Sequence, residues 1–208
     1  MENLFNPTLP YALTDISRGL CVGITPKFYD KSAADRIFDI LEDEVEYNEN
    51  STVVVYGKTY NIPRKQVAYG DIDTSYKFSG TVVPSKPWIP IISEIKSEIE
   101  EMTGESYNFC LVNRYKDGTH HIGYHKDDEK DLGNNPSIAS LSFGATRKFY
   151  FKYDNKLDVK NIVHKIDLEH GTLCMMYNPT NKYWKHSVPS EYHVKEPRIN
   201  LTFRKIVK

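Results

Sequence analysis

Polar and apolar residues alternate without a break in Arg198-Ile199-Asn200-Leu201-Thr202-Phe203-Arg204, near the end of the sequence. Because side chains of a β-strand point to alternate faces, its polar residues share one face and its apolar residues the other. A solvent-facing strand would show the same alternation. Here, however, both ends of the polar face carry an arginine, whose planar guanidinium binds carboxylates in a bidentate manner. Their Cα atoms lie roughly 20 Å apart, so both side chains can lean over a small dicarboxylate.

Short strand-like segments, separated by turns that contain Gly, Pro and Asn, fill the second half of the chain. They cover residues 107–115, 137–143, 147–153, 161–168, 171–177, 183–188 and 197–206. Many short strands of this kind are typical of a β-sandwich or a jelly roll. We therefore expect an α+β protein that is mainly β, with a double-stranded β-helix (jelly-roll) core.

Two helices and a hairpin precede these strands. The first helix is expected to begin near Asp30, whose side chain can cap it, and the second to follow Pro90 and end at Gly104. Residues 52–60 form two β-rich arms around a Tyr-Gly tip, which predicts a hairpin.

Residues 1–28 are rich in turn formers, so we expect them to be irregular or to hold a short strand. The predicted organisation is one compact unit. In it, residues 1–85 form an N-terminal extension and a β-hairpin nucleotide-recognition lid, and residues 86–208 form the jelly-roll core with its supporting helices.

Length and composition also narrow the class of protein. The 208 residues suffice for one well-buried domain, and the net charge of −1 means that any affinity for nucleic acid must come from local basic patches. The 3 cysteines match no zinc or disulfide framework, so we expect an intracellular, reduced protein. No segment approaches the roughly 20 apolar residues of a membrane span, and we expect no membrane association.

A candidate metal site begins at His125-Lys126-Asp127. On an extended strand, His125 and Asp127 project to the same side. Two histidines and one carboxylate form the facial triad of non-heme Fe(II) oxygenases, so one more histidine is needed. The later candidates are His164, His170, His186 and His193, of which we prefer His186, in an aromatic and β-branched run that ends at Pro189. A lone His-x-Asp pair is most often an ordinary surface turn, so the metal hypothesis depends on the rest of the C-terminal half.

Several segments together resemble one family. In chain order they are Pro63–Gln66, Tyr76–Gly80, Pro87–Pro90, Asn113–Gly118, His125–Glu129, Ile138–Ala145, His186-Ser187 and Arg198–Lys205. The chain resembles the AlkB family of Fe(II)- and 2-oxoglutarate-dependent dioxygenases from about residue 53 to its end, and is most similar to the type that dealkylates duplex DNA. Motifs that are this long and collinear are highly specific.

The resemblance implies that His125, Asp127 and His186 bind Fe(II) and carry the catalysis. It further implies that 2-oxoglutarate and O2 are consumed, that a methyl group on a base nitrogen is oxidised, and that formaldehyde, succinate and CO2 are released. The expected lesions are 1-methyladenine and 3-methylcytosine in DNA.

The same resemblance implies a binding site for 2-oxoglutarate. Tyr115 and Arg198 would hold its distal carboxylate, while Asn113 and Arg204 would lie near its metal-chelating end. Asn200, on the polar face between the two arginines, is expected in the same site.

A further set of residues is expected to bind the damaged base and its DNA. These residues are Tyr56, Arg64, Tyr76, Phe78, Ser79, Asp128 and Glu129. A base methylated at adenine N1 or cytosine N3 is cationic, and an acidic residue beside the metal would favour it, so Asp128 is expected to contact the base. An enzyme that acts on a base within a duplex must flip that base out. Tyr56 is expected to act as an intercalating wedge and Phe78 to stack on the flipped base.

We expect the partner to be alkylated DNA in duplex form, and the protein to be a nuclear monomer. The family's Arg-Gly-Lys loop, which grips the strand opposite the lesion, has no counterpart in residues 152–158, and no sliding-clamp motif is found at the N-terminus. The alternatives are the same chemistry on single-stranded DNA, RNA or protein, or a catalytically inactive nucleic-acid-binding jelly roll. Arg198 and Arg204 argue against the inactive alternative, because a pure binder needs no buried carboxylate clamp.

Overall fold

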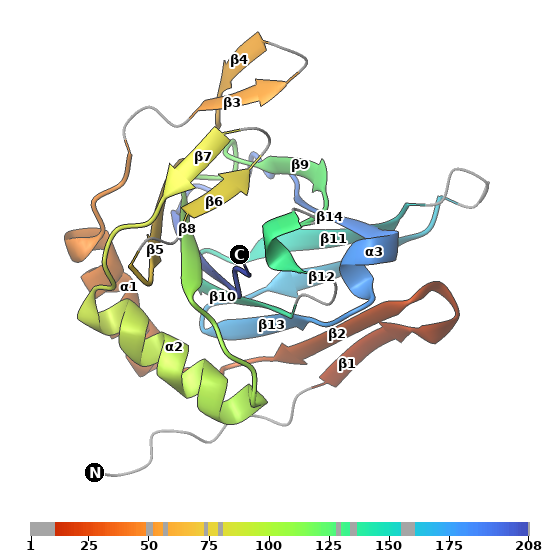
Figure 1. The fold of residues 1–208 in the computed structure, drawn as a ribbon, viewed down its shortest axis with the longest axis horizontal. Helices are drawn as coiled ribbons and strands as arrows, with labels where there is room; N and C mark the ends of the chain where they lie inside the picture. The colour runs from red at the N-terminus through yellow and green to blue at the C-terminus, as the bar shows by residue number, and fades with distance from the viewer. Residues whose placement is uncertain are drawn as a thin grey trace.

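Two antiparallel β-sheets face each other in the computed structural model, which describes residues 11–48, 52–55, 58–72, 75–78, 81–127, 130–133, 137–154 and 161–207 (Figure 1). The major sheet has seven strands in the order β1-β2-β13-β10-β15-β8-β5, and the minor sheet has four in the order β12-β11-β14-β9. Residues of both sheets line one cavity between them. This arrangement confirms the expected jelly-roll core of a mainly β protein.

The bounds of the strands agree closely with the segments predicted for the second half of the chain. The major sheet contains β1 (Tyr11–Asp15), β2 (Leu20–Thr25), β5 (Lys65–Gly70), β8 (Phe109–Tyr115), β10 (Ile138–Gly144), β13 (Thr172–Met176) and β15 (Arg198–Arg204). The minor sheet contains β9 (Ile122–His125), β11 (Arg147–Tyr153), β12 (Val163–Leu168) and β14 (Trp184–Val188). Short helical turns are η1 (Ile16–Arg18), η2 (Lys130–Leu132) and α3 (Thr180–Tyr183).

Two longer helices, α1 (Lys31–Glu44) and α2 (Pro90–Thr103), cover the outer face of the major sheet (Figure 1). The Asp30 side chain caps α1 by accepting a hydrogen bond from the Ala33 amide at 2.8 Å. Helix α2 begins at Pro90 and ends at Gly104, whose φ of 71° is a left-handed conformation that glycine adopts at little cost. Both predicted helices are therefore confirmed, together with their start and stop signals.

The two faces of strand β15 (Arg198–Arg204) lie in different surroundings. Ile199, Leu201 and Phe203 are fully buried in the core cluster that includes residues of α1 and α2. The polar side chains of the same strand are buried as well, on the side of the minor sheet. This polar face therefore points into the protein and not into solvent, as its two arginines suggested.

The expectation for the N-terminal region was wrong in part. Residues 11–25 form β1 and β2, joined by a turn at Gly19 with φ 69°, and β2 pairs with β13 inside the major sheet. Strand β5, which the sequence did not predict, pairs with β8. The major sheet thus takes strands from both sides of residue 85, and the division into a lid and a core at that position stays a prediction.

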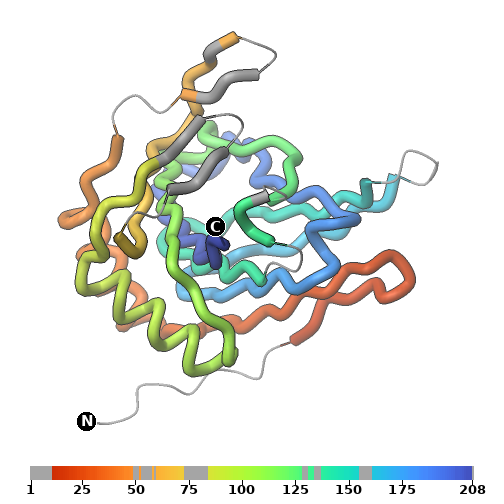
Figure 2. Tube along the Cα trace, viewed as in Figure 1, coloured from red at the N-terminus to blue at the C-terminus, as the bar shows by residue number. Residues whose placement is uncertain are grey.

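Two hairpins lie at one end of the molecule (Figure 1), away from the β1–β2 hairpin, which is red in Figure 2. Strands β3 (Thr52–Val55) and β4 (Lys58–Asn61) form the predicted hairpin, with Val55 opposite Lys58. Strands β6 (Ser75–Phe78) and β7 (Thr81–Pro84) form another, which the sequence did not predict. Among the residues that the structure describes, no helix is both long and apolar enough to cross a membrane.

Candidate metal centre

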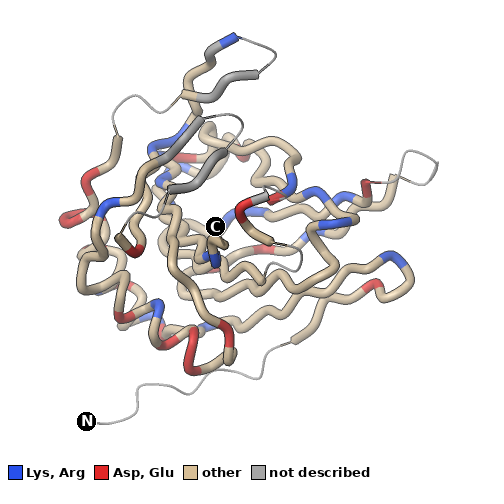
Figure 3. Tube along the Cα trace, viewed as in Figure 1, with Lys and Arg blue, Asp and Glu red and all other residues tan. Residues whose placement is uncertain are grey.

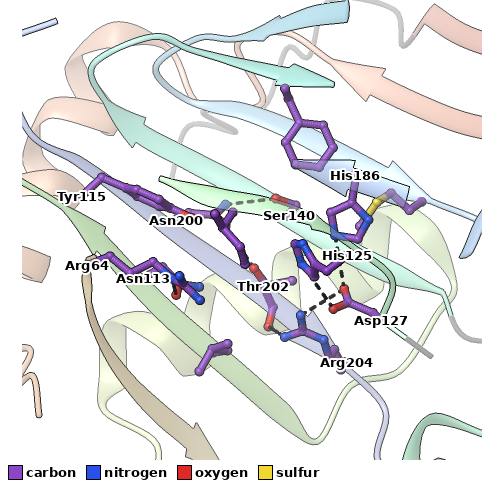
Figure 4. Close-up of a pocket in the computed structure, with 14 residues that line it drawn as sticks. Arg64, Asn113, Tyr115, His125, Asp127, Ser140, His186, Asn200, Thr202 and Arg204 are labelled. Atoms are coloured by element: carbon purple, nitrogen blue, oxygen red, sulfur yellow. Dashed lines mark hydrogen bonds and ion pairs between the residues drawn. The ribbon is translucent and has the colours of Figure 1, made fainter. Parts of the chain in front are cut away.

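Three side chains from two chain segments meet at one end of the cavity (Figure 4). His125 is the last residue of β9, Asp127 follows two residues later, and His186 lies on β14 directly opposite His125. The His125 Nε2 atom lies 3.9 Å from Asp127 Oδ1, and the His186 Nε2 atom lies 3.8 Å from Asp127 Oδ2. One potential ligand atom from each residue lies within 4.8 Å of the others, a spacing that suits a single ion between them.

The structure brings together the three residues that the sequence pattern nominated, but it holds two of them differently from the expectation. Strand β9 ends at His125, so Asp127 is not on the same extended strand. The antiparallel pairing of β9 with β14 is what brings His186 to His125. The three alternative histidines are not part of this group. The ring of His164, on β12, lies 5.3 Å from that of Trp184, His170 pairs with Asp35 at 3.1 Å, and the side chain of His193 is 75% exposed.

Burial keeps the two imidazoles neutral, the form in which histidine binds metals. Burial, together with the neighbouring His125, lowers the pKa of His186 to about 3. Burial also lowers the pKa of His125. Burial alone would raise the pKa of Asp127, but the charges of Arg204, His186 and His125 outweigh it and bring the pKa to about 2. At neutral pH the site therefore offers two neutral nitrogen donors and one carboxylate.

The hydrogen bonds around the triad also fit a metal site. The His125 Nδ1 atom lies 2.9 Å from the Gly123 carbonyl oxygen, which can only accept, so Nδ1 carries the proton and the Nε2 lone pair is available. Asp127 Oδ2 accepts a hydrogen bond from Arg204 Nη2 at 3.0 Å. Asp127 Oδ1 is buried without a hydrogen-bond partner among the described residues, which is costly unless a ligand satisfies it. Two imidazoles and one carboxylate with such an oxygen suit Fe(II).

Arg198 lies at the other end of β15, fully buried against Tyr115. Its guanidinium carbon lies 5.2 Å from the centre of the Tyr115 ring, and its Nη2 donates to Ser142 Oγ at 2.9 Å. Within the described part of the chain, Nε and Nη1 of Arg198 have no hydrogen-bond partner. Burial lowers the pKa of Arg198 to about 10, so the group is still charged at neutral pH. A buried cation with unpaired N–H groups is suited to binding a carboxylate.

The remaining polar residues expected in the cofactor site also gather here (Figure 4). Asn113 Oδ1 accepts a hydrogen bond from Arg64 Nε at 2.8 Å, so Arg64 lies beside a residue expected to bind the cofactor. The Asn200 amide donates to Ser140 Oγ and to the Leu141 carbonyl, both at 2.9 Å. Arg64 therefore lies in this site. The side-chain amide of Asn200 already donates its hydrogen bonds to other protein groups.

The sequence did not identify the apolar wall of the cavity, which consists of Leu111, Ile122, Phe149 and Met176. Their only signal was alternation along strands, which does not tell a cavity wall from a packed core. Of the expected DNA-binding residues, Tyr56, Ser79, Asp128 and Glu129 lie outside the described residues. Tyr76 and Phe78 lie on β6, but the structure describes only their backbone.

Comparisons with known proteins agree with this site. The family model of the 2OG-Fe(II) oxygenase superfamily matches residues 21–204. The chain is 46% identical over 185 residues to the DNA oxidative demethylase ALKBH2 of Mus musculus, which covers 86% of this chain and 77% of the relative. It is 40% identical over 198 residues to the alpha-ketoglutarate-dependent dioxygenase alkB homolog 3 of Bos taurus, which covers 93% and 68% of the two chains.

A solved structure supports the fold. The chain superposes on the structure of OsALKBH1 with a TM-score of 0.60 at 19% sequence identity, over 88% of this chain and 96% of the other. The matched family model spans the segments that carry the triad and β15. The chain therefore belongs to the 2OG-Fe(II) oxygenase superfamily, in its AlkB group.

Proposed function

We propose that this protein is a DNA repair dioxygenase that oxidatively demethylates N-alkylated bases, using Fe(II), O2 and 2-oxoglutarate. One observation carries the proposal: a His-Asp-His triad, in which Asp127 and His186 are buried, lies in the same jelly-roll core as a buried, partly unpaired arginine, in a chain 46% identical to a DNA oxidative demethylase. His125, Asp127 and His186 would hold Fe(II). When bound, Fe(II) with 2-oxoglutarate and O2 supplies the oxidant that hydroxylates the methyl group, which then leaves as formaldehyde.

The other residues of the site would bind and shield the co-substrate. Arg198 and Tyr115 would hold the distal carboxylate of 2-oxoglutarate, because the unpaired N–H groups of Arg198 need an anionic acceptor. Arg204, already paired with Asp127, would lie near the metal-chelating end together with Asn113. The apolar wall would limit the access of water, which strengthens each charge–charge interaction inside the site.

Two acidic residues after the triad aspartate would select the cationic base. Asp128 is the preferred contact and Glu129 the second, since a carboxylate favours a base that carries a positive charge. Asp128→Ala should reduce turnover of 3-methylcytosine much more than it reduces iron binding. Equal turnover by the variant and the wild type would remove the role of Asp128.

Residues of the β3–β4 and β6–β7 hairpins would carry out base flipping. Tyr56, between β3 and β4, would fill the gap that the flipped base leaves, and Phe78 would stack on that base together with Tyr76 and Ser79. Tyr56→Ala should therefore lower activity on duplex DNA and leave activity on single strands intact. Equal losses on both substrates would show that Tyr56 is no wedge.

Duplex DNA is the proposed substrate form, and a nuclear monomer the proposed state. The 46% identity to a DNA oxidative demethylase supports DNA, and the β3–β4 hairpin supports a duplex. The competing function is the same oxidation of single-stranded DNA, RNA or protein. To separate them, the protein is incubated with Fe(II), 2-oxoglutarate and equal amounts of methylated duplex DNA, methylated single-stranded RNA or methylated peptide, and succinate is measured. Stimulation by the RNA or the peptide alone would overturn the proposal.

A further inference from the structure

A groove with a volume of about 230 Å³ lies between helices α1 and α2. Its lining includes exposed residues of both helices, Arg36 and Glu94, so the groove opens to solvent. The two helices cover the outer face of the major sheet, which therefore separates the groove from the cavity that holds the candidate metal centre. We call it the helix groove.

Each helix lines the helix groove with residues at positions i, i+3, i+4 and i+7. On α1 these are Ala33, Arg36, Ile37 and Ile40, and on α2 they are Ile91, Glu94, Ile95 and Glu98. Residues with this spacing share one face of a helix. Each helix thus contributes two isoleucines to the groove, and one isoleucine of each pair, Ile40 or Ile91, is only partly buried. The helix layer therefore leaves an apolar surface that the protein core does not cover.

The groove lies in the most acidic layer of the molecule. Helix α1 has five acidic and two basic residues, and α2 has four acidic and one basic, so the two helices together carry a net charge of −6. The whole chain carries a net charge of only −1. The acidic residues are the red segments of the helix layer in Figure 3. The negative charge is therefore concentrated around the groove.

Three carboxylates form a row along α2. Glu94, Glu98 and Glu101 are spaced four and three residues apart, and like charges at this spacing destabilise a helix. Among the residues that the structure describes, the lysine of α2, Lys96, forms its ion pair with Glu100 at 2.9 Å, and no basic side chain pairs with the row. Burial raises the pKa of Glu98, the charges of Glu94 and Glu101 add to the rise, and a hydrogen bond from Tyr29 opposes it. A cation of a partner would relieve this repulsion.

The charge of the helix layer narrows the class of occupant. Nucleic acids and the cytoplasmic surface of a membrane are anionic, so both would be repelled. A second copy of this chain would bring its own acidic helices to the contact, and like charges that face each other across an interface are unfavourable. An occupant that fits must be apolar opposite the isoleucines and basic opposite the carboxylates.

The secondary structure of the occupant follows from the walls of the groove. The main-chain groups of α1 and α2 are bonded within their own helices, so the groove offers no strand edge to an extended peptide. A helical occupant satisfies its own backbone and can lay an apolar face between two helices. Arg36 lies on α1 and the carboxylates lie on α2, so the basic residues of such a helix should lie over α2.

We propose that the helix groove binds a basic, amphipathic helix of another protein. The proposal is independent of the proposed demethylation, because α1 and α2 contribute no residue to the lining of the metal-site cavity. A partner in the helix groove would leave that cavity open.

The test uses a synthetic peptide of about 18 leucine and lysine residues, with its leucines at positions i, i+3, i+4 and i+7. The control peptide has the same composition with leucine and lysine in scrambled order. Each is titrated into the full-length protein, in which the isoleucine methyl groups are labelled for NMR. The signals of Ile40 and Ile91 should shift with the first peptide only, and the signal of Ile122, on the wall of the metal-site cavity, should not move.

Variants measure the contribution of each part of the groove to the Kd, which is obtained from the fluorescence anisotropy of the labelled peptide. E94Q/E98Q should raise the Kd about fivefold, since ion pairs near the surface are individually weak. D167N/E169Q removes two exposed carboxylates at the end of β12, makes the same change in net charge and should leave the Kd unchanged. Ile91→Gln should raise the Kd about tenfold through loss of apolar contact. If E94Q/E98Q unfolds, Ile91→Gln decides the outcome.

Four results would overturn the proposal. They are unmoved signals of Ile40 and Ile91 at saturating peptide, equal shifts with the scrambled peptide, an equal rise in Kd for D167N/E169Q, and shifts of the same two signals on addition of duplex DNA or anionic vesicles. A dimer in sedimentation that E94Q/E98Q dissociates would overturn it in favour of a second copy. If the protein demethylates DNA but the peptide does not bind, only the helix-groove proposal fails.

Discussion

Removing the carboxylate of Glu191 should destabilise the protein by about 3 kcal/mol, because it leaves a buried guanidinium without a counter-charge. The side chains of Arg147 and Glu191 are 1% and 8% exposed, and the Arg147 Nε atom lies 3.1 Å from Glu191 Oε2. Breaking such a pair by removing one partner costs about 3–5 kcal/mol. Arg147 keeps hydrogen bonds to the carbonyl oxygens of Asp117, His120 and Pro189 at 3.2, 3.0 and 2.6 Å, so we expect the lower end.

The same substitution should also weaken the binding of 2-oxoglutarate. The Tyr115 ring contacts two guanidinium groups, with its centre 5.7 Å from that of Arg147 and 5.2 Å from that of Arg198. Arg147 thus holds the residue that we propose to bind the distal carboxylate. Glu191→Ala should raise the KM for 2-oxoglutarate more than it lowers kcat, whereas Glu191→Gln keeps an acceptor oxygen and should cost only about 1 kcal/mol of stability.

Urea unfolding followed by circular dichroism measures the loss, and Glu196→Ala, an exposed glutamate in the same segment, is the matched control. Burial would raise the pKa of Glu191, but hydrogen bonds from the Lys148 amide and Arg147 bring it below its usual value. A carboxylate with a lowered pKa adds stability above its usual pKa and loses it as pH falls through the lowered value. Wild type should therefore lose more stability than Glu191→Gln below about pH 4. A cost below about 1 kcal/mol for Glu191→Ala, or one equal to the control, would refute this reasoning.

Three further substitutions test the co-substrate site, the start of α1 and the packing around Gly118. Arg198→Lys should raise the KM for 2-oxoglutarate at least tenfold in a succinate assay, because a lysine cannot form the bidentate contact; an unchanged KM would contradict the role of Arg198. Asp30→Ala should lower the free energy of unfolding by about 1 kcal/mol through loss of the α1 cap, and an unchanged urea midpoint would show that the cap contributes nothing. Gly118→Ala would place its Cβ 1.8 Å from the Glu191 carbonyl oxygen, so the same unfolding experiment should show a loss of about 1–3 kcal/mol. A Gly118→Ala variant as stable as the wild type would show that the backbone at Glu191 shifts away from the added Cβ at little cost.

Local patterns predicted those parts of the fold that depend on neighbours in the sequence. Asp30 and Gly104 mark helix ends through hydrogen bonds and backbone conformation within a few residues, and both were predicted correctly. The alternation of polar and apolar residues over Arg198–Arg204 predicted a strand with two different faces, because successive side chains of a strand point to opposite sides. The His-x-Asp pair, with the aromatic and β-branched run that contains His186, was enough to nominate the three residues of the triad.

Long-range pairing explains what the sequence did not reveal. Strand β2 pairs with β13, about 150 residues later, and β5 pairs with β8. The sequences of β2 and β5 do not show which strand each will pair with. The hydrogen bonds of Arg147 run to main-chain oxygens, which have no signature in a sequence.

Mass spectrometry of an oligonucleotide that carries one 1-methyladenine or 3-methylcytosine, paired or unpaired, tests the proposed demethylation after incubation with the protein. We predict that the wild type removes the methyl group only when Fe(II), 2-oxoglutarate and O2 are all present. We also predict that His186→Ala removes none and that the paired substrate is processed. Retention of the methyl group by both oligonucleotides under complete conditions, or equal removal by His186→Ala, would contradict the claim.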